Sequence, residues 1–104
     1  MKVYSVLITS SAEKDLMAIV QYISSQLLAP KSALRTLEVL EEKIAELSQL
    51  PERCPLVSDA RLAYLGYRKL VVDDYIVFNS IDTKEDRIYV ERILHSRRNW
   101  VGLI

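Results

Sequence analysis

The hydrophobic period of this chain changes at Gly66, and that change limits the folds open to it. Before Gly66, apolar residues recur every three or four positions along two segments, which is the spacing of one face of an α-helix. After it, short runs rich in β-branched and aromatic residues alternate with polar turns, as is typical of strands. A chain of 104 residues, half of them hydrophobic, is long enough for one domain with its own core. We therefore expect a single α+β domain over residues 1–104.

Two amphipathic helices are predicted in the first half of the chain. Ser10 and Glu13 have the spacing of a capping box, so the first helix is expected from about Ser11 to Leu27. The second helix is expected from Pro30 to Leu50, because proline suits a first helical turn and Pro51 stops the helix. Helices joined by so short a turn are expected to form an antiparallel hairpin.

Four strands are predicted, one before the helices and three after them. The runs with strand character are Lys2–Ile8, Tyr67–Val72, Tyr75–Ser80 and Arg87–His95. The last three are joined by the short turns Asp73-Asp74 and 82–86, so they are expected to form an antiparallel meander. Residues 51–65 are predicted to be a loop with a short helical turn near 59–64. The order β-α-α-β-β-β predicts an antiparallel sheet with the helix hairpin packed on it.

The composition argues against several kinds of site. Cys54 is the only cysteine, so no internal disulfide can form, and we expect a small apolar loop residue there. With one Cys and one His, the sequence has no metal-ligand spacing, and it has no glycine-rich phosphate loop, so no metal or cofactor is expected. The first residues lack the apolar run and small residues typical of a signal peptide, and no apolar run approaches the length of a membrane span, so a cytoplasmic protein without a membrane partner is expected. The formal net charge is zero, so binding to nucleic acid would need a local basic patch.

The segment His95–Trp100 gathers an imidazole, two guanidinium groups and an indole. It follows the last strand of the meander, so it is expected beside Tyr75 and the Asp73-Asp74 turn. Arginine forks and aromatic faces bind phosphates and bases, and they bind an acidic peptide equally well. The alternative is structural, with the arginines paired to the turn carboxylates and the indole packed on the sheet edge. The candidates for binding a partner or target are Tyr75, Arg97, Arg98 and Trp100.

A second basic pair lies at the start of the meander. Arg68 and Lys69 are expected beside Asn79, so the basic residues form two groups at opposite ends of the sheet. His95 belongs to the other group and can act as a general acid or base near neutral pH, although a lone histidine is more often structural.

Three runs in the second half resemble the RelE/ParE family of bacterial toxins. They are Tyr67-Arg68-Lys69-Leu70, Tyr75-Ile76-Val77-Phe78 and Ile93-Leu94-His95-Ser96-Arg97-Arg98. The opening is also similar, with a strand followed by Ser11-Ala12-Glu13-Lys14-Asp15-Leu16. The resemblance covers nearly the whole chain and implies the β-α-α-β-β-β fold. It also implies the toxin of a type II toxin–antitoxin system of the plasmid stabilisation type. An antitoxin would bind and neutralise this toxin in a hetero-oligomer, and the free toxin would arrest growth.

The family divides by mechanism. RelE-like members cleave messenger RNA on the ribosome without a metal, and ParE-like members inhibit DNA gyrase by binding. If this chain is an endoribonuclease, the resemblance assigns phosphate stabilisation to Arg68 and Arg97. Lys69 or His95 would then carry protons. Ile76 stands where RelE-like enzymes carry an arginine, and no tyrosine follows the C-terminal arginines.

The missing arginine and the neutral net charge favour ParE-like inhibition of gyrase. The alternatives are RelE-like cleavage of messenger RNA and a degenerate member that retains only antitoxin binding.

Overall fold

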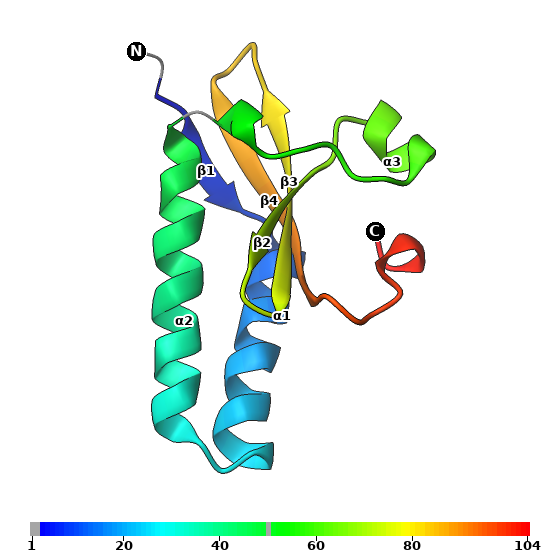
Figure 1. Cartoon of the computed structure of the whole chain (residues 1–104). Coiled ribbons are helices and arrows are strands. Elements are labelled where there is room, and N and C mark those ends of the chain that lie inside the picture. Colours follow the sequence, from blue (N-terminus) through cyan, green and yellow to red (C-terminus); the bar gives the residue numbers. More distant parts are fainter. Residues whose placement is uncertain (1–2, 50) are drawn as a thin grey trace.

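The computed structural model describes residues 3–49 and 51–104 (Figure 1). Its helices and strands are β1 (Ser5–Ile8), α1 (Ser10–Gln21), α2 (Pro30–Ala45), α3 (Ala60–Tyr64), β2 (Arg68–Val72), β3 (Tyr75–Asp82) and β4 (Arg87–His95). A π-helical turn, η1 (Tyr22–Gln26), extends α1, and 3₁₀ turns lie at Glu46–Ser48, Pro51–Arg53 and Trp100–Gly102. The predicted order of elements is therefore confirmed, with the short helix of the loop as α3.

The strands form one mixed sheet in the order β1-β4-β3-β2. β2, β3 and β4 make the predicted antiparallel meander, in which Arg68 lies opposite Asn79 and Tyr75 lies opposite His95. β1 pairs with β4 in parallel, so the expectation of a wholly antiparallel sheet is wrong for this pair. The reason is topological. The two-helix hairpin returns the chain to the end where β1 began, so β2 runs parallel to β1, and the third strand of a meander runs parallel to its first.

The start and end of α1 differ from the prediction. Thr9, rather than Ser10, is the N-cap, and its hydroxyl oxygen accepts a hydrogen bond from the Ala12 N–H at 3.2 Å. The regular α-helix ends at Gln21, and the chain continues as the π-helical turn instead of reaching Leu27 in α-helical geometry. Serine and threonine are both common N-cap residues, so two adjacent hydroxyl side chains leave the start of the helix uncertain by one residue.

The other boundaries lie close to their predicted positions. α2 begins at Pro30 as expected and ends at Ala45, and the predicted end at Leu50 lies outside the described residues. The predicted start of the first strand, Lys2, also lies outside them, and the described part of the strand begins at Ser5.

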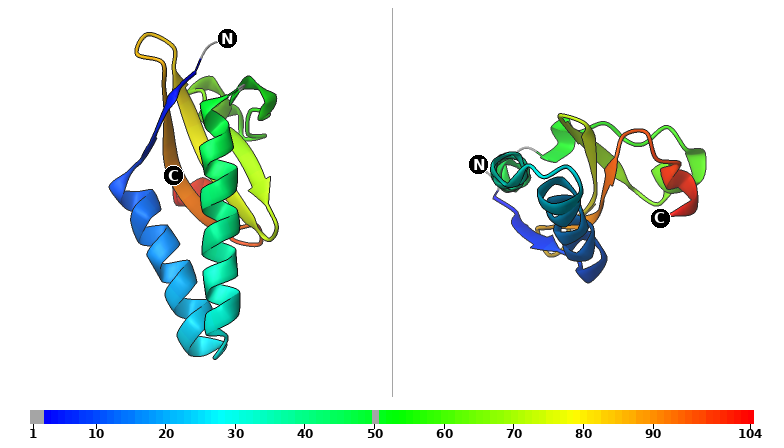
Figure 2. Two further views of the ribbon diagram at one scale, coloured as in Figure 1. Left: turned by 90° about the vertical axis from the view of Figure 1, so that its left-hand side faces the viewer. Right: turned by 90° about the horizontal axis from the view of Figure 1, so that it is seen from below.

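Both faces of the sheet are covered, by different parts of the chain (Figure 2). The helix hairpin packs on one face, here called the helix face. The core there is formed by Tyr4, Ala12, Leu16, Leu40, Ile44, Leu47, Cys54, Val72, Val77, Ile88, Val90 and Ile93. α3 and the C-terminal segment pack on the other face, here called the C-terminal face. The core there is formed by Val57, Leu62, Ile76, Phe78 and Leu94, against which Tyr67, Trp100, Leu103 and Ile104 pack.

Candidate functional site

Arg68 is held by the loop that precedes α3. Its Nη1 donates to the carbonyl oxygen of Cys54 at 2.6 Å and to that of Glu52 at 3.4 Å. The same loop is attached to the outer edge of β2 through the Lys69 N–H, which donates to the Pro55 carbonyl at 3.0 Å. The guanidinium of Arg68 therefore fastens a loop to an edge strand, which is a structural role.

The four residues assigned to RNA cleavage do not converge on one site. Opposite residues of paired antiparallel strands share a face. Lys69 lies opposite Phe78 and so belongs to the C-terminal face, whereas Arg68 leaves the strand on the helix face. His95 lies at the far end of the sheet on the helix face, opposite Tyr75, and Arg97 is exposed beyond the end of β4. The set is divided between two faces and two ends.

The position that carries an arginine in RelE-like enzymes is part of the core. Ile76 is only 9% exposed and packs with Phe78 and Leu94 beneath α3 and the C-terminal segment. The indole of Trp100 covers Phe78, with ring centroids 4.9 Å apart. Trp100 thus packs on a face of the sheet, whereas the structural alternative placed its indole on the sheet edge.

The turn after β4 is fixed by its backbone and leaves two guanidinium groups free. The Ser96 N–H donates to the Asp74 carbonyl at 2.8 Å, and the Arg97 N–H donates to His95 Nδ1 at 3.1 Å. Both Arg97 and Arg98 are exposed. In the described chain, neither guanidinium forms an ion pair with Asp73 or Asp74, so both are available to a partner.

A hollow of about 400 Å³ brings together Tyr75, His95 and Arg98, but not Arg97 or Trp100, and we call it the aromatic pocket. Its walls include Tyr22 from η1, Tyr75 from β3, His95 from β4 and the exposed Arg98. The rings of Tyr75 and His95 meet edge to face, with centroids 5.6 Å apart. Because His95 Nδ1 accepts a hydrogen bond, the neutral ring carries its proton on Nε2, which is a donor for a bound group.

Tyr22 was not among the sequence candidates. Nothing in its local pattern marks it, since an aromatic residue in an amphipathic helix is most often a core residue. It reaches the pocket only because η1 passes the end of the meander, which is a consequence of packing. Burial, followed by the charges of Asp74 and Tyr22, raises the pKa of the Tyr75 phenol.

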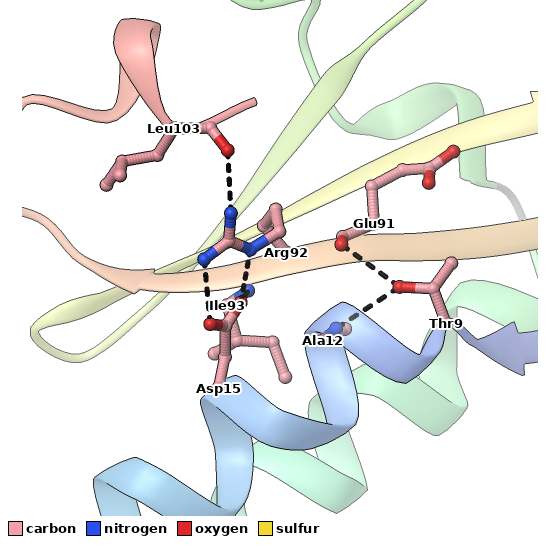
Figure 3. A network of polar contacts seen from close by, with 7 residues as sticks. All are labelled: Thr9, Ala12, Asp15, Glu91, Arg92, Ile93 and Leu103. Carbon is pink, nitrogen blue, oxygen red and sulfur yellow. Dashed lines mark hydrogen bonds and ion pairs between the residues drawn. The ribbon is translucent and has the colours of Figure 1, made fainter.

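An ion pair between α1 and β4 joins three parts of the chain (Figure 3). Asp15 Oδ2 accepts from Arg92 Nε at 2.7 Å, and Oδ1 accepts from Nη2 at 2.9 Å. Asp15 Oδ2 also accepts from the Ile93 N–H at 3.0 Å, and Arg92 Nη1 donates to the Leu103 carbonyl at 2.6 Å. The hydrogen bonds to Asp15 raise the pKa of Arg92, although its burial opposes them. The pair ties the first helix, the central strand β4 and the C-terminal segment together.

The same edge of β4 is completed by a threonine. β1 ends at Ile8, and the Thr9 N–H and hydroxyl then donate to the carbonyls of Val90 and Glu91, each at 3.1 Å. A short strand, one hydroxyl and one carboxylate thus satisfy consecutive backbone groups of β4. Neither Asp15 nor Arg92 was a sequence candidate, because 77 residues separate them.

Cys54 lies in the helix-face core, as expected for a small apolar residue. Burial raises the pKa of its thiol, although the positive charges of Arg68 and Arg53 oppose that effect. A thiol with a raised pKa is a poor nucleophile. No cluster of three potential His, Cys, Asp or Glu ligands is found in the described part of the chain. Within the same residues, no helix combines the length and apolar character needed to cross a membrane.

The fold is shared with toxin–antitoxin proteins of known structure. The chromosomal ParDE system from P. aeruginosa has a TM-score of 0.74 at 22% identity, covering 89% of this chain and 96% of the other. The complex RelBE2 from Mycobacterium tuberculosis has a TM-score of 0.62 at 22% identity, covering 91% and 93%. No curated protein sequence matches the chain.

The sequence decides the family. The family model for the ParE toxin of the type II toxin–antitoxin system parDE matches residues 6–100. The chain therefore belongs to the ParE toxin family, and the expected RelE/ParE resemblance and α+β class are confirmed.

Replacing Asp15 by alanine is expected to destabilise the fold. It leaves the guanidinium of Arg92, whose side chain is only 23% exposed, without its carboxylate. We expect a loss of about 2–4 kcal/mol in the free energy of unfolding, measured by urea titration. Glu46→Ala is the matched control, because it removes an ion pair with Lys43 in which both side chains are half exposed. That variant should change stability by no more than about 0.5 kcal/mol, and equal losses in the two variants would contradict this account.

Tyr75 is expected to make the stability of the chain sensitive to alkaline pH. Because its pKa is higher in the folded than in the unfolded chain, the stability it contributes is complete below the unfolded pKa of about 10 and is lost as pH rises through the folded value. Urea titrations on both sides of this window should show a smaller alkaline loss for Tyr75→Phe than for the unmodified chain. Tyr64→Phe, at a residue 90% exposed, should follow the unmodified chain. Identical profiles for all three proteins would contradict the prediction.

Proposed function

We propose that this ParE-family toxin arrests bacterial growth by binding DNA gyrase, and that it does not cleave RNA. The observation that carries the proposal is the dispersal of the cleavage candidates over two faces and two ends of the sheet. Cleavage at a 2′-hydroxyl needs a base, an acid and a cation around one phosphate. Arg68 is instead engaged by loop carbonyls.

The core under the C-terminal segment supports the same proposal. An arginine at position 76 would have to place a charge between Phe78 and Leu94, where Ile76 now packs. The cost of burying such a charge is large unless a partner is present. Removing one positioned cation from a transition-state clamp costs orders of magnitude in rate. A binding toxin needs no such clamp.

The aromatic pocket is the surface that we assign to target binding. It combines two phenols, an imidazole donor and the exposed guanidinium of Arg98 with apolar side chains and with Asp15, whose carboxylate is paired with Arg92. Tyrosine and arginine are among the residue types that most often dominate binding energy at protein interfaces. Arg97, exposed on the same turn, extends this surface.

We also propose that an antitoxin partner neutralises the chain in a toxin–antitoxin hetero-oligomer. The family consists of toxins from type II toxin–antitoxin systems, which supports this proposal. The fold shared with the toxin–antitoxin proteins from P. aeruginosa and M. tuberculosis also supports it.

The test is to induce the chain alone in bacteria and map the 5′ ends of abundant messenger RNAs by primer extension within minutes. Growth arrest with intact messages is the expected result, and co-expression of the neighbouring small gene should restore growth. New 5′ ends inside translated codons would instead establish the RelE-like activity. An unaffected culture would indicate a degenerate member.

A variant pair locates the surface. His95→Ala combined with Arg98→Ala should raise the inducer level needed for arrest by about tenfold, the effect of losing interface hot spots. Lys84→Ala, in the exposed β3–β4 turn, is the matched control and should behave as the unmodified chain. Undiminished arrest by the double variant would remove the aromatic pocket from the proposal.

A further inference from the structure

The turn of the helix hairpin projects beyond the end of the sheet (Figures 1 and 2). Residues 23–36, here called the hairpin tip, contribute nothing to the two core clusters of the sheet. Within the tip, Ile23 and Ala33 are buried, so the two helices pack on each other there. Three large apolar side chains of the tip are nevertheless more than half exposed: Leu27, Leu28 and Leu34.

Leu28 occupies a backbone conformation that favours glycine. Its φ is +51°, in the left-handed region, where a β-carbon is strained. The Ala29 N–H donates to the Ile23 carbonyl at 3.1 Å, so Leu28 lies in the C-terminal cap of η1, where helices usually place glycine. The other non-glycine residues with positive φ in the described chain are Asp73 and Asp86, of a residue type that tolerates it.

Among the described residues, packing of the Leu28 side chain does not compensate for this strain. The Leu28 side chain is 82% exposed, so it gains almost no burial in the folded protein. A strained, exposed leucine at a position that suits glycine is a cost to the isolated chain. The inference from such an outlier is that the side chain is used in contact with another molecule.

The charge of the tip indicates the kind of molecule. Residues 23–36 include Lys31 and Arg35 and no acidic residue, although the whole chain has as many acidic as basic residues. The complementary surface is an apolar pocket bordered by carboxylates. An anionic membrane is a poorer match, because recognition of lipid head groups uses clusters of four to eight basic residues.

The tip is continuous with the aromatic pocket. A hollow of about 260 Å³ is lined by Ala18, Gln21, Tyr22, Ser25 and Gln26. It shares Ala18 and Tyr22 with the aromatic pocket. A partner that fills both hollows therefore reaches Ser25 and Gln26 of the tip, beside the exposed Leu27 and Leu28.

We infer that the hairpin tip is a second contact surface for the protein target of the toxin, with Leu28 inserted into an apolar, acid-rimmed pocket of that target. The inference rests on the proposed function, in which the chain acts by binding a protein. The inference adds a binding site at the hairpin tip, beyond the end of the sheet. None of the sequence motifs includes this segment.

Leu28→Gly gives the sharpest test, because glycine relieves the backbone strain while it removes the side chain. Its melting temperature should equal or exceed that of the unmodified chain, so loss of function cannot come from unfolding. The inducer level for half-maximal growth arrest should rise by about tenfold or more. Co-purification with the antitoxin should be unchanged. Leu28→Met, which keeps an apolar side chain, should retain arrest.

Charge reversal tests the acidic rim. Lys31→Glu with Arg35→Glu should weaken arrest, whereas Lys84→Glu, in the exposed turn at the other end of the sheet, should not. Arrest by Leu28→Gly at the unmodified inducer level would overturn the inference and leave the proposed function intact. The inference would also be overturned if Leu28→Gly still arrested growth but no longer bound the antitoxin, because the tip would then be a surface for the antitoxin.

A membrane role is tested with vesicles of phosphatidylserine and phosphatidylcholine. Vesicle binding by the unmodified chain that Leu28→Gly abolishes would also overturn the inference. If the unmodified chain does not arrest growth, both the proposed function and the inference fail. Induction of the unmodified chain therefore distinguishes this outcome from failure of the inference alone.

Discussion

The pair formed by Asp15 and Arg92 is the interaction on which the arrangement of this toxin depends. One carboxylate receives three hydrogen bonds from β4, two from a guanidinium and one from the Ile93 backbone. The guanidinium in turn holds the Leu103 carbonyl. Charge-assisted bidentate pairs of this kind stabilise the fold and also fix the relative orientation of the two side chains. The first helix is thus oriented on the sheet, and the C-terminal segment is held on the opposite face.

The C-terminal segment matters because of what it covers. Its indole packs on Phe78, and the cluster beneath it includes Ile76. The centre of the C-terminal face is therefore filled with apolar side chains. The residues that we assign to target binding lie elsewhere, at the end of the meander beside η1, where Tyr22, Tyr75, His95 and Arg98 line the aromatic pocket. The candidate binding residues are thereby divided, because Trp100 packs on the C-terminal face while Tyr75, His95 and Arg98 line the aromatic pocket.

Much of this fold follows from local pattern. Amphipathic spacing predicted the hairpin, and alternating apolar runs with short turns predicted the meander, because both depend on neighbours in sequence. The parallel pairing of β1 with β4 and the ion pair of Asp15 depend on residues far apart in the chain, which no local pattern records. The same holds for Tyr22 and for the loop carbonyls that engage Arg68. Trp100 looked like a binding residue in its motif and is half-buried against the sheet.

Inhibition of gyrase by binding is the central claim, and a reconstituted supercoiling reaction tests it most directly. Purified gyrase, relaxed plasmid and ATP would be incubated with the purified chain, with and without its antitoxin. We predict that the chain stops supercoiling in proportion to its concentration, and that the antitoxin restores it. Full supercoiling at a large excess of a chain that arrests growth in cells would contradict the claim.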